Sequence, residues 1–259
     1  NYRYYVLDDP FISDYDFDMM LKELEQLERE NPEFFDVNSP SQRVGGEVTK
    51  SFDTSVHSTP MYSLNNSYSL EDLIEWENRI KKIVDAPIEY TCELKFDGVS
   101  INLTYKDGEL VKAVTRGDGI KGDDVTRNVK TIPTVPLKLR GDITGEFEAR
   151  GEIVMPIKGF NNLNNFRIEN GEEPFKNPRN TASGSLKLQD SKEVSKRPLE
   201  CLIYSVEDPK MFDNHIQFLK NAKSYGFNVY KKYIFSTSLD EIFEFIQNWE
   251  KNRSELPFE

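Results

Sequence analysis

The sequence is poor in the residues that build metal sites. It has only 2 cysteines and 2 histidines among 259 residues, and it has no Cys-x-x-Cys pair. Zinc modules need such pairs, so none is expected within this chain. Cys92 and Cys201 stand alone in apolar stretches, and we find no export signal, which together favour the cytoplasm. Because the chain starts at Asn1 and not at Met, we expect it to be part of a longer protein.

The sequence also lacks long apolar runs and an excess of positive charge. No run approaches the roughly 20 residues that span a bilayer, so we expect no membrane association. The formal net charge is −12, which argues against a chain that holds nucleic acid by overall charge alone. A local basic surface is still possible between Lys176 and Arg197, where six lysines and arginines fall. That run could equally be a solvated loop and helix face.

Hydrophobic residues make up 37% of the chain and charged residues 30%, enough apolar mass for a core. Residues 1–31 are predicted to be helical and to end at Asn31-Pro32. Residues 36–60 are predicted to be a linker or an irregular crossing segment. A second helix is predicted from Leu70 to about Val84, with Ser69 as its cap. Further helices are predicted at 156–168, 213–225 and 239–251.

Strands are predicted in clusters. Ile101–Tyr105 and Leu110–Thr115 read as a hairpin around Asp107-Gly108. Other strands are predicted at 147–155, 199–206 and 227–233. Helices fall between the clusters and do not alternate regularly with single strands. The pattern therefore indicates an α+β fold, with mostly antiparallel sheets and flanking helices.

The most informative residue is Lys95, in the apolar run 88–105. If this run is one strand, Glu93, Lys95 and Asp97 share a face. A lysine between two carboxylates could be a nucleophile or part of a salt-bridged strand face. A free lysine has a pKa of about 10.4 and must lose its proton to attack phosphorus. Two carboxylates alone oppose that loss, so a further cation is needed.

Two more strands are predicted to carry polar residues towards Lys95. Arg116 is predicted to end the strand opposite Lys95, and Glu152 to point inward from the next strand, an arrangement that suits a nucleotide phosphate. Gly117 to Gly122 match G-x-G-x-x-G. We do not interpret them as a dinucleotide fingerprint, because the strand before them belongs to a hairpin and Pro133 leaves room only for a short helix.

Five segments, taken in order, resemble bacterial NAD+-dependent DNA ligases, members of the covalent nucleotidyltransferases. Residues 93–98 resemble their Lys-x-Asp-Gly adenylation motif. The other four segments are residues 4–8 with 13–18, 57–64, 115–119, and 178–186. The resemblance implies the covalent nucleotidyltransferase (ATP-grasp-like ligase) fold with a small N-terminal helical subdomain. It divides the chain into 1–50, a subdomain and linker that bind nicotinamide mononucleotide, and 51–259, an adenylation domain incomplete at its C-terminus.

The resemblance also implies a reaction and roles. Lys95 would attack the α-phosphate of NAD+, supported by Asp97, and the resulting AMP would pass to nicked DNA. The residues implied to bind the co-substrate are Tyr4, Tyr5, Asp14, Phe17, Asp18, Ser63, Leu64, Glu93, Arg116 and Glu152. Arg179 and Lys187 would face DNA. Many family members have His at the place of Tyr5 and Tyr at that of Phe17, which leaves the nicotinamide contacts open.

The family further implies Mg²⁺ or Mn²⁺, with zinc only in a C-terminal part that this chain lacks. No protein ligands for a metal can be named from this sequence. The expected partners are NAD+, AMP and nicked double-stranded DNA, and the expected state is a monomer in the bacterial cytoplasm, associated with the nucleoid. As an isolated piece the chain is not expected to seal nicks. Two alternatives stay open: an NAD+- or AMP-binding module without catalysis, and a relative that uses ATP.

Overall fold

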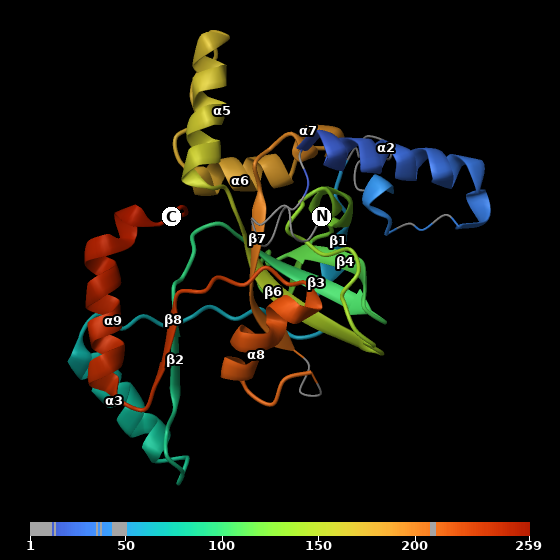
Figure 1. Cartoon of the computed structure of the whole chain (residues 1–259). Helices are drawn as coiled ribbons and strands as arrows, with labels where there is room; N and C mark the ends of the chain where they lie inside the picture. Colours follow the sequence, from blue (N-terminus) through green and yellow to red (C-terminus); the bar gives the residue numbers. More distant parts are fainter. Residues whose placement is uncertain (1–11, 13, 35, 37, 43–50, 208–210) are drawn as a thin grey trace.

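The computed structural model describes residues 12, 14–34, 36, 38–42, 51–207 and 211–259. Its centre is a four-stranded antiparallel sheet with the strand order β4-β3-β6-β7 (Figure 1). The strands are β3 Val99–Lys106, β4 Glu109–Thr115, β6 Glu146–Val154 and β7 Glu200–Glu207. The predicted hairpin and the strands near 147–155 and 199–206 are therefore confirmed.

The turn between β3 and β4 explains why this hairpin forms. Asp107 and Gly108 both have positive φ, at 49° and 79°. Two central residues of this kind make the tight turn whose twist matches that of antiparallel strands, and Asp and Gly adopt it at low cost. Asp107 Oδ1 also accepts a 2.8 Å hydrogen bond from the backbone N–H of Gly145. The turn thus fixes the register of the central strand.

One face of the sheet forms the main core. Side chains alternate along β3, so Ile101, Leu103 and Tyr105 all point to this face and are fully buried. Four helices bring apolar side chains onto the same core. They are α4 Thr126–Lys130, α6 Pro178–Leu186, α7 Ser191–Ser195 and α8 His215–Asn221. Burying this face against the helices leaves the opposite face of the sheet to carry polar groups.

The opposite face is polar along most of β3 and β6. Ser100 and Asn102 of β3 lie beside Glu152 and Arg150 of β6 in the register of the pair. A small apolar cluster of Val154, Leu202 and Phe258 lies at one end of this face, with Phe96 and Tyr230 packed against it. Polar chemistry and core packing thus occupy opposite sides of the same strands.

A smaller unit lies beside the sheet (Figure 1, left). Strands β2 Tyr90–Glu93 and β8 Tyr233–Ser236 form an antiparallel pair, next to helices α3 Leu70–Lys81 and α9 Leu239–Asn252. The predicted cap of α3 is confirmed. The Ser69 side chain accepts a hydrogen bond from the backbone N–H of Asp72, and the Asp72 side chain accepts one from the backbone N–H of Ser69. The predicted strand at 227–233 is wrong: 227–232 are irregular, and β8 begins where that prediction ended. Phe227 and Val229 are apolar because they pack in the main core.

Several other predictions are corrected or refined. Thr54–Val56 form strand β1, paired with β5 Lys121–Asp123, inside the stretch predicted to be a linker. The helix predicted at 213–225 is split into α8 and a 3-10 turn at 222–225. Helix α5 Ile157–Glu169 agrees with its prediction and projects from the body of the molecule (Figure 1, top). The described residues contain no helix long and apolar enough to cross a membrane.

The N-terminal region contributes helix α2 Asp14–Glu30, which ends directly before Asn31-Pro32 as predicted. Short 3-10 turns follow at 32–34 and 40–42. Asn38 connects this region to the rest of the chain. Its Nδ2 donates to Glu109 Oε2 at 3.1 Å, and its Oδ1 accepts from Lys130 Nζ at 3.1 Å. The N-terminal helix is therefore tethered through its following segment to β4 and α4.

Candidate functional site

Lys95 lies in the connection between β2 and β3, and the prediction that it sits within a strand is wrong. The chain must leave the β2–β8 pair and enter the four-stranded sheet between Glu93 and Val99, so it cannot run as one strand. Glu93, Lys95 and Asp97 consequently do not share one strand face. Glu93 pairs with His215, and Asp97 pairs with Arg179 at 2.9 Å. Lys95 is exposed, and no hydrogen bond or ion pair engages it within the described part of the chain.

The segment between β2 and β3 that carries Lys95, called the lysine connection below, is nevertheless held firmly by its neighbours. Phe96 packs edge-to-face on Tyr230 and on Phe258, with ring centroids 5.0 Å and 5.9 Å away. The backbone N–H of Asp97 donates to the carbonyl of Glu259 at 2.8 Å. A Cβ added at Gly98 would lie 2.3 Å from the carbonyl oxygen of Ile153, which explains why glycine ends the motif. These contacts therefore hold the backbone that follows Lys95 in place.

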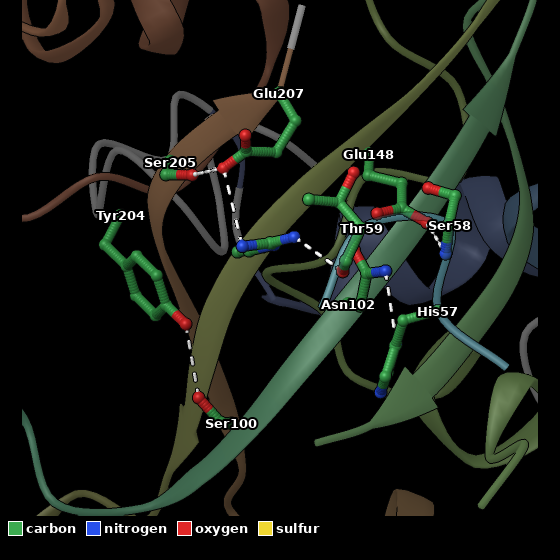
Figure 2. Close-up of polar contacts among 10 residues, drawn as sticks. His57, Ser58, Thr59, Ser100, Asn102, Glu148, Tyr204, Ser205 and Glu207 are labelled. Atoms are coloured by element: carbon green, nitrogen blue, oxygen red, sulfur yellow. Dashed lines mark hydrogen bonds and ion pairs between the residues drawn. The ribbon is translucent and has the colours of Figure 1, made fainter. Parts of the chain in front are cut away.

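Glu152 faces Lys95 from β6. Burial raises the pKa of the Glu152 carboxyl, while the hydroxyl of Ser100 and the charge of Lys95 oppose the rise. Ser100 Oγ lies 3.0 Å from Glu152 Oε2. It also lies 3.2 Å from the Tyr204 hydroxyl (Figure 2). Burial also raises the pKa of Tyr204. The result is a half-buried carboxylate and two hydroxyls beside an exposed ammonium.

Arg116 directly follows β4, and its backbone N–H donates to the carbonyl of Ser100 at 3.0 Å. Its guanidinium Nη2 donates to Ser63 Oγ at 2.7 Å. The prediction placed Lys95, Arg116 and Glu152 on three successive strands. Instead, Arg116 and Glu152 flank the start of β3, and Lys95 lies on the connection that leads into it. All three belong to one end of the sheet.

The glycines after Arg116 form a tight turn between β4 and β5, and α4 does not begin until Thr126. Asp118 Oδ1 accepts from the backbone N–H groups of Lys121 and Ile120, both at 2.9 Å. These two bonds hold the pKa of Asp118 below its usual range. No helix opens at the glycines, which agrees with our reading that this is not a dinucleotide fingerprint.

A cleft beside the lysine connection is lined by nine residues, three of which carry ionisable groups that the prediction did not connect with this site. Its lining residues are Glu93, Leu94, Phe96, Leu202, Ile203, Tyr204, Val229, Tyr230 and Lys232. His215, which pairs with Glu93 at its rim, was also missed. These residues come from segments more than a hundred positions downstream, and sequence spacing alone gives no signal for that meeting.

The remaining predicted residues are distributed as follows. Leu64, next to Ser63, is exposed. Arg179 and Lys187 lie at the start and just past the end of α6, and Lys187 pairs with Asp123 at 2.7 Å.

The residues predicted at the N-terminus are placed less completely. Asp14, Phe17 and Asp18 belong to α2, whereas Tyr4 and Tyr5 lie outside the described residues. Within the described ranges, no group of three or more His, Cys, Asp or Glu side chains could hold a metal ion.

Comparison with known proteins connects this geometry to a family. The family model described as NAD-dependent DNA ligase adenylation domain matches residues 49–259. The chain belongs to this family. A second model, described as DNA ligase-like, N-terminal NAD+-binding domain, matches residues 1–45. The mixed fold of antiparallel sheets and flanking helices is consistent with the adenylation domain, and the family is NAD-dependent.

Curated relatives of this adenylation domain family align with the whole chain. A protein named DNA ligase from Flavobacterium psychrophilum is 58% identical over 261 residues, which cover 100% of this chain and 39% of that protein. One from Christiangramia forsetii is 56% identical with the same coverage. One from Bacteroides fragilis is 46% identical over 99% of this chain and 39% of that protein. The chain thus spans about two fifths of the length of these relatives.

Proposed function

We propose that this chain is the adenylating part of an NAD+-dependent DNA ligase and that Lys95 is its nucleophile. The observation that carries the proposal is the position of Lys95 on a braced connection, opposite Glu152, at the end of the sheet where Arg116 lies. Membership of the adenylation domain family supports it. The same membership favours NAD+ over ATP as the AMP donor.

In the proposed reaction, the Lys95 nitrogen attacks the α-phosphorus of NAD+. A P–N bond forms, and the P–O bond to the nicotinamide mononucleotide phosphate breaks. The leaving nicotinamide mononucleotide takes that electron pair. Lys95, which is exposed, gives up two protons to solvent: one from the ammonium before the attack and one from the nitrogen once it is bonded to phosphorus. Positioning the amine and the phosphate together supplies much of the rate, because a bound pair reacts as one molecule.

The neighbouring groups suit distinct tasks. Arg116 offers a planar fork that can bind phosphate or ribose oxygens. Ser63 fixes one end of that fork. Lys95 is close enough to Glu152 for its positive charge to lower the pKa of that carboxyl, against the rise caused by burial. The cleft lined by Leu202, Tyr204 and Tyr230 would offer apolar walls for a base. Glu93, held by His215, would border the base from the opposite side.

The N-terminal residues and the DNA-facing residues complete the proposal. Residues 1–50, with Tyr4, Tyr5, Asp14, Phe17 and Asp18, would bind the nicotinamide end, which the match of residues 1–45 supports. Arg179 at the start of α6 and Lys187 just past its end would contact nicked DNA, the partner we propose from the relatives' name. Mg²⁺ would be held mainly through NAD+ phosphates, and a bacterial cytoplasmic monomer remains our expectation.

The decisive experiment measures the covalent AMP adduct by intact-mass spectrometry after incubation with NAD+. We expect Lys95→Ala to form no adduct and Lys158→Ala, at an exposed lysine on α5, to form it at the normal rate. An undiminished adduct in the Lys95 variant would reject the assignment. Replacing NAD+ with ATP should give no adduct, and an adduct with ATP would favour the ATP-using alternative.

A further inference from the structure

His57 lies between the central strand and the loop that carries Arg116. Its side chain is buried, with 7% exposed. Its ring Nε2 lies 3.2 Å from the carbonyl oxygen of Arg116. Its Nδ1 lies 3.5 Å from Asn102 Nδ2 on β3 (Figure 2). A carbonyl can only accept, so Nε2 must carry the proton. The Asn102 amide nitrogen can in turn donate to Nδ1.

The residues after His57 are held to the sheet in the same way. The backbone N–H of Ser58 faces Glu148 Oε1 at 3.4 Å, and the Thr59 carbonyl accepts from Arg150 Nη2 at 2.9 Å (Figure 2). Arg150 is fixed in turn by Glu207 at 3.7 Å. Three consecutive residues therefore each contact a polar side chain on β3 or β6.

The same segment is joined to the loop after Arg116. The backbone N–H of His57 donates to the Ile120 carbonyl at 2.9 Å, and that of Met61 donates to the Gly119 carbonyl at 2.8 Å. Ser63 then accepts from Arg116 Nη2. Both ends of Arg116 are thus controlled by residues 57–63: its backbone carbonyl by the His57 ring, and its guanidinium by Ser63.

We propose that His57 is a positioning residue that sets the orientation of Arg116 for the nucleotide. It touches no substrate, and it acts by holding the Arg116 backbone while residues 58–63 bring Ser63 to the guanidinium. This inference rests on the proposed function, because it assigns Arg116 to NAD+ binding. It predicts that loss of the imidazole weakens NAD+ binding more than it slows the chemical step.

The test measures adduct formation in the full-length protein over a range of NAD+ concentrations. We expect His57→Phe, which keeps bulk but removes both ring nitrogens, to raise the half-saturating NAD+ concentration about tenfold. The rate at saturation should fall less than about threefold. His57→Gln, whose amide can donate to the Arg116 carbonyl and accept from Asn102, should recover most of the loss. An unchanged half-saturating concentration in His57→Phe would overturn the proposal.

Two comparisons separate positioning from general destabilisation. Thr134→Val removes another buried hydrogen bond, to the Cys201 N–H on the opposite face, and should lower the melting temperature without changing NAD+ dependence. In an Arg116→Ala background, His57→Phe should add little further loss. Fully additive losses would contradict action through Arg116. If His57→Phe does not fold, Asn102→Ser should give a smaller shift in the same direction, and no shift would count against the proposal.

A readout without nucleotide distinguishes this inference from the proposed function. Hydrogen exchange at the Met61 amide should be faster in His57→Phe than in Thr134→Val, because the bond to Gly119 loosens. If the unsubstituted protein forms no adduct but this difference is seen, the proposed function fails and the structural link stands. If the adduct forms normally and exchange is unchanged, the positioning role fails alone.

Discussion

Arg179 Nη1 lies 2.9 Å from Asp97 Oδ1, so the arginine proposed to face DNA is paired with the carboxylate two positions after the proposed nucleophile. Both side chains are half exposed, at 59% and 50%. This solvent-accessible ion pair therefore joins the first turn of α6 to the segment that carries Lys95. DNA that attracts Arg179 would release Asp97 next to Lys95.

The first prediction concerns the strength of this pair. A double-mutant cycle with Arg179→Ala and Asp97→Ala should give a coupling below about 1 kcal/mol, because exposed ion pairs are screened by water. The coupling should shrink further when salt is added. Chemical denaturation of the four proteins measures it.

Arg179→Ala should slow transfer of AMP from the adduct to nicked DNA more than it slows adduct formation, and the opposite order would argue against a DNA-facing role.

The second prediction concerns Gly98. Gly98→Ala should destabilise the protein by about 1–3 kcal/mol, because the new methyl group cannot avoid the Ile153 carbonyl without moving backbone. The adduct should also form more slowly, since the displaced backbone carries Lys95. Gly184→Ala is the matched control: it has open space around it inside α6 and should be neutral or stabilising. Thermal melting and adduct kinetics of both variants make the comparison.

The third prediction concerns Glu152 and pH. Because burial raises the pKa of Glu152, the folded protein holds that proton more tightly than the unfolded chain does. The protonated Glu152 carboxyl therefore contributes stability at acid pH. That contribution is lost as pH rises from the ordinary carboxyl range through the raised pKa of Glu152. Glu152→Gln should be more stable than the parent above that window and similar below it, while adduct formation slows. Denaturant unfolding at several pH values would show this, and a variant that loses stability only at high pH would contradict it.

The fourth prediction concerns the aromatic base of the lysine connection. Phe96→Ala should cost about 1–3 kcal/mol, less than a fully buried phenylalanine, because Phe96 is only partly buried. Adduct formation should fall even at temperatures where the variant stays folded, since Lys95 loses its support. Phe96→Leu should recover part of both effects. Phe166→Ala, at an exposed position on α5, should change neither, and a similar loss there would indicate a nonspecific effect.

The sequence predicted the parts of the fold that local chemistry decides. The Asp107-Gly108 turn, the Ser69 cap and the alternation along β3 each identify an element from its neighbours alone. It failed where the chain changes partners. The apolar run 88–105 looked like one strand, but its two halves pair with different sheets. A run of apolar residues records burial and does not record the partner that buries it.

The site was predictable to a similar degree. Lys95, Arg116 and Glu152 do gather at one end of the sheet, because the hairpin register brings Thr115 and Glu152 to either side of the start of β3. The pairing of Glu93 with His215 and of Asp97 with Arg179 could not be predicted. Each joins residues separated by many elements, and only the packed fold brings them together.

The two-sided character of β3 and β6 has a consequence for how such a protein can diverge. Ile101, Leu103 and Ile153 pack in the core on one side, while Ser100, Asn102 and Glu152 carry polar groups on the other side. Exchanging the second set leaves the first set in place. Mutations restricted to the second set, whether natural or from a library of variants, could therefore alter ligand preference while β3 and β6 remain paired.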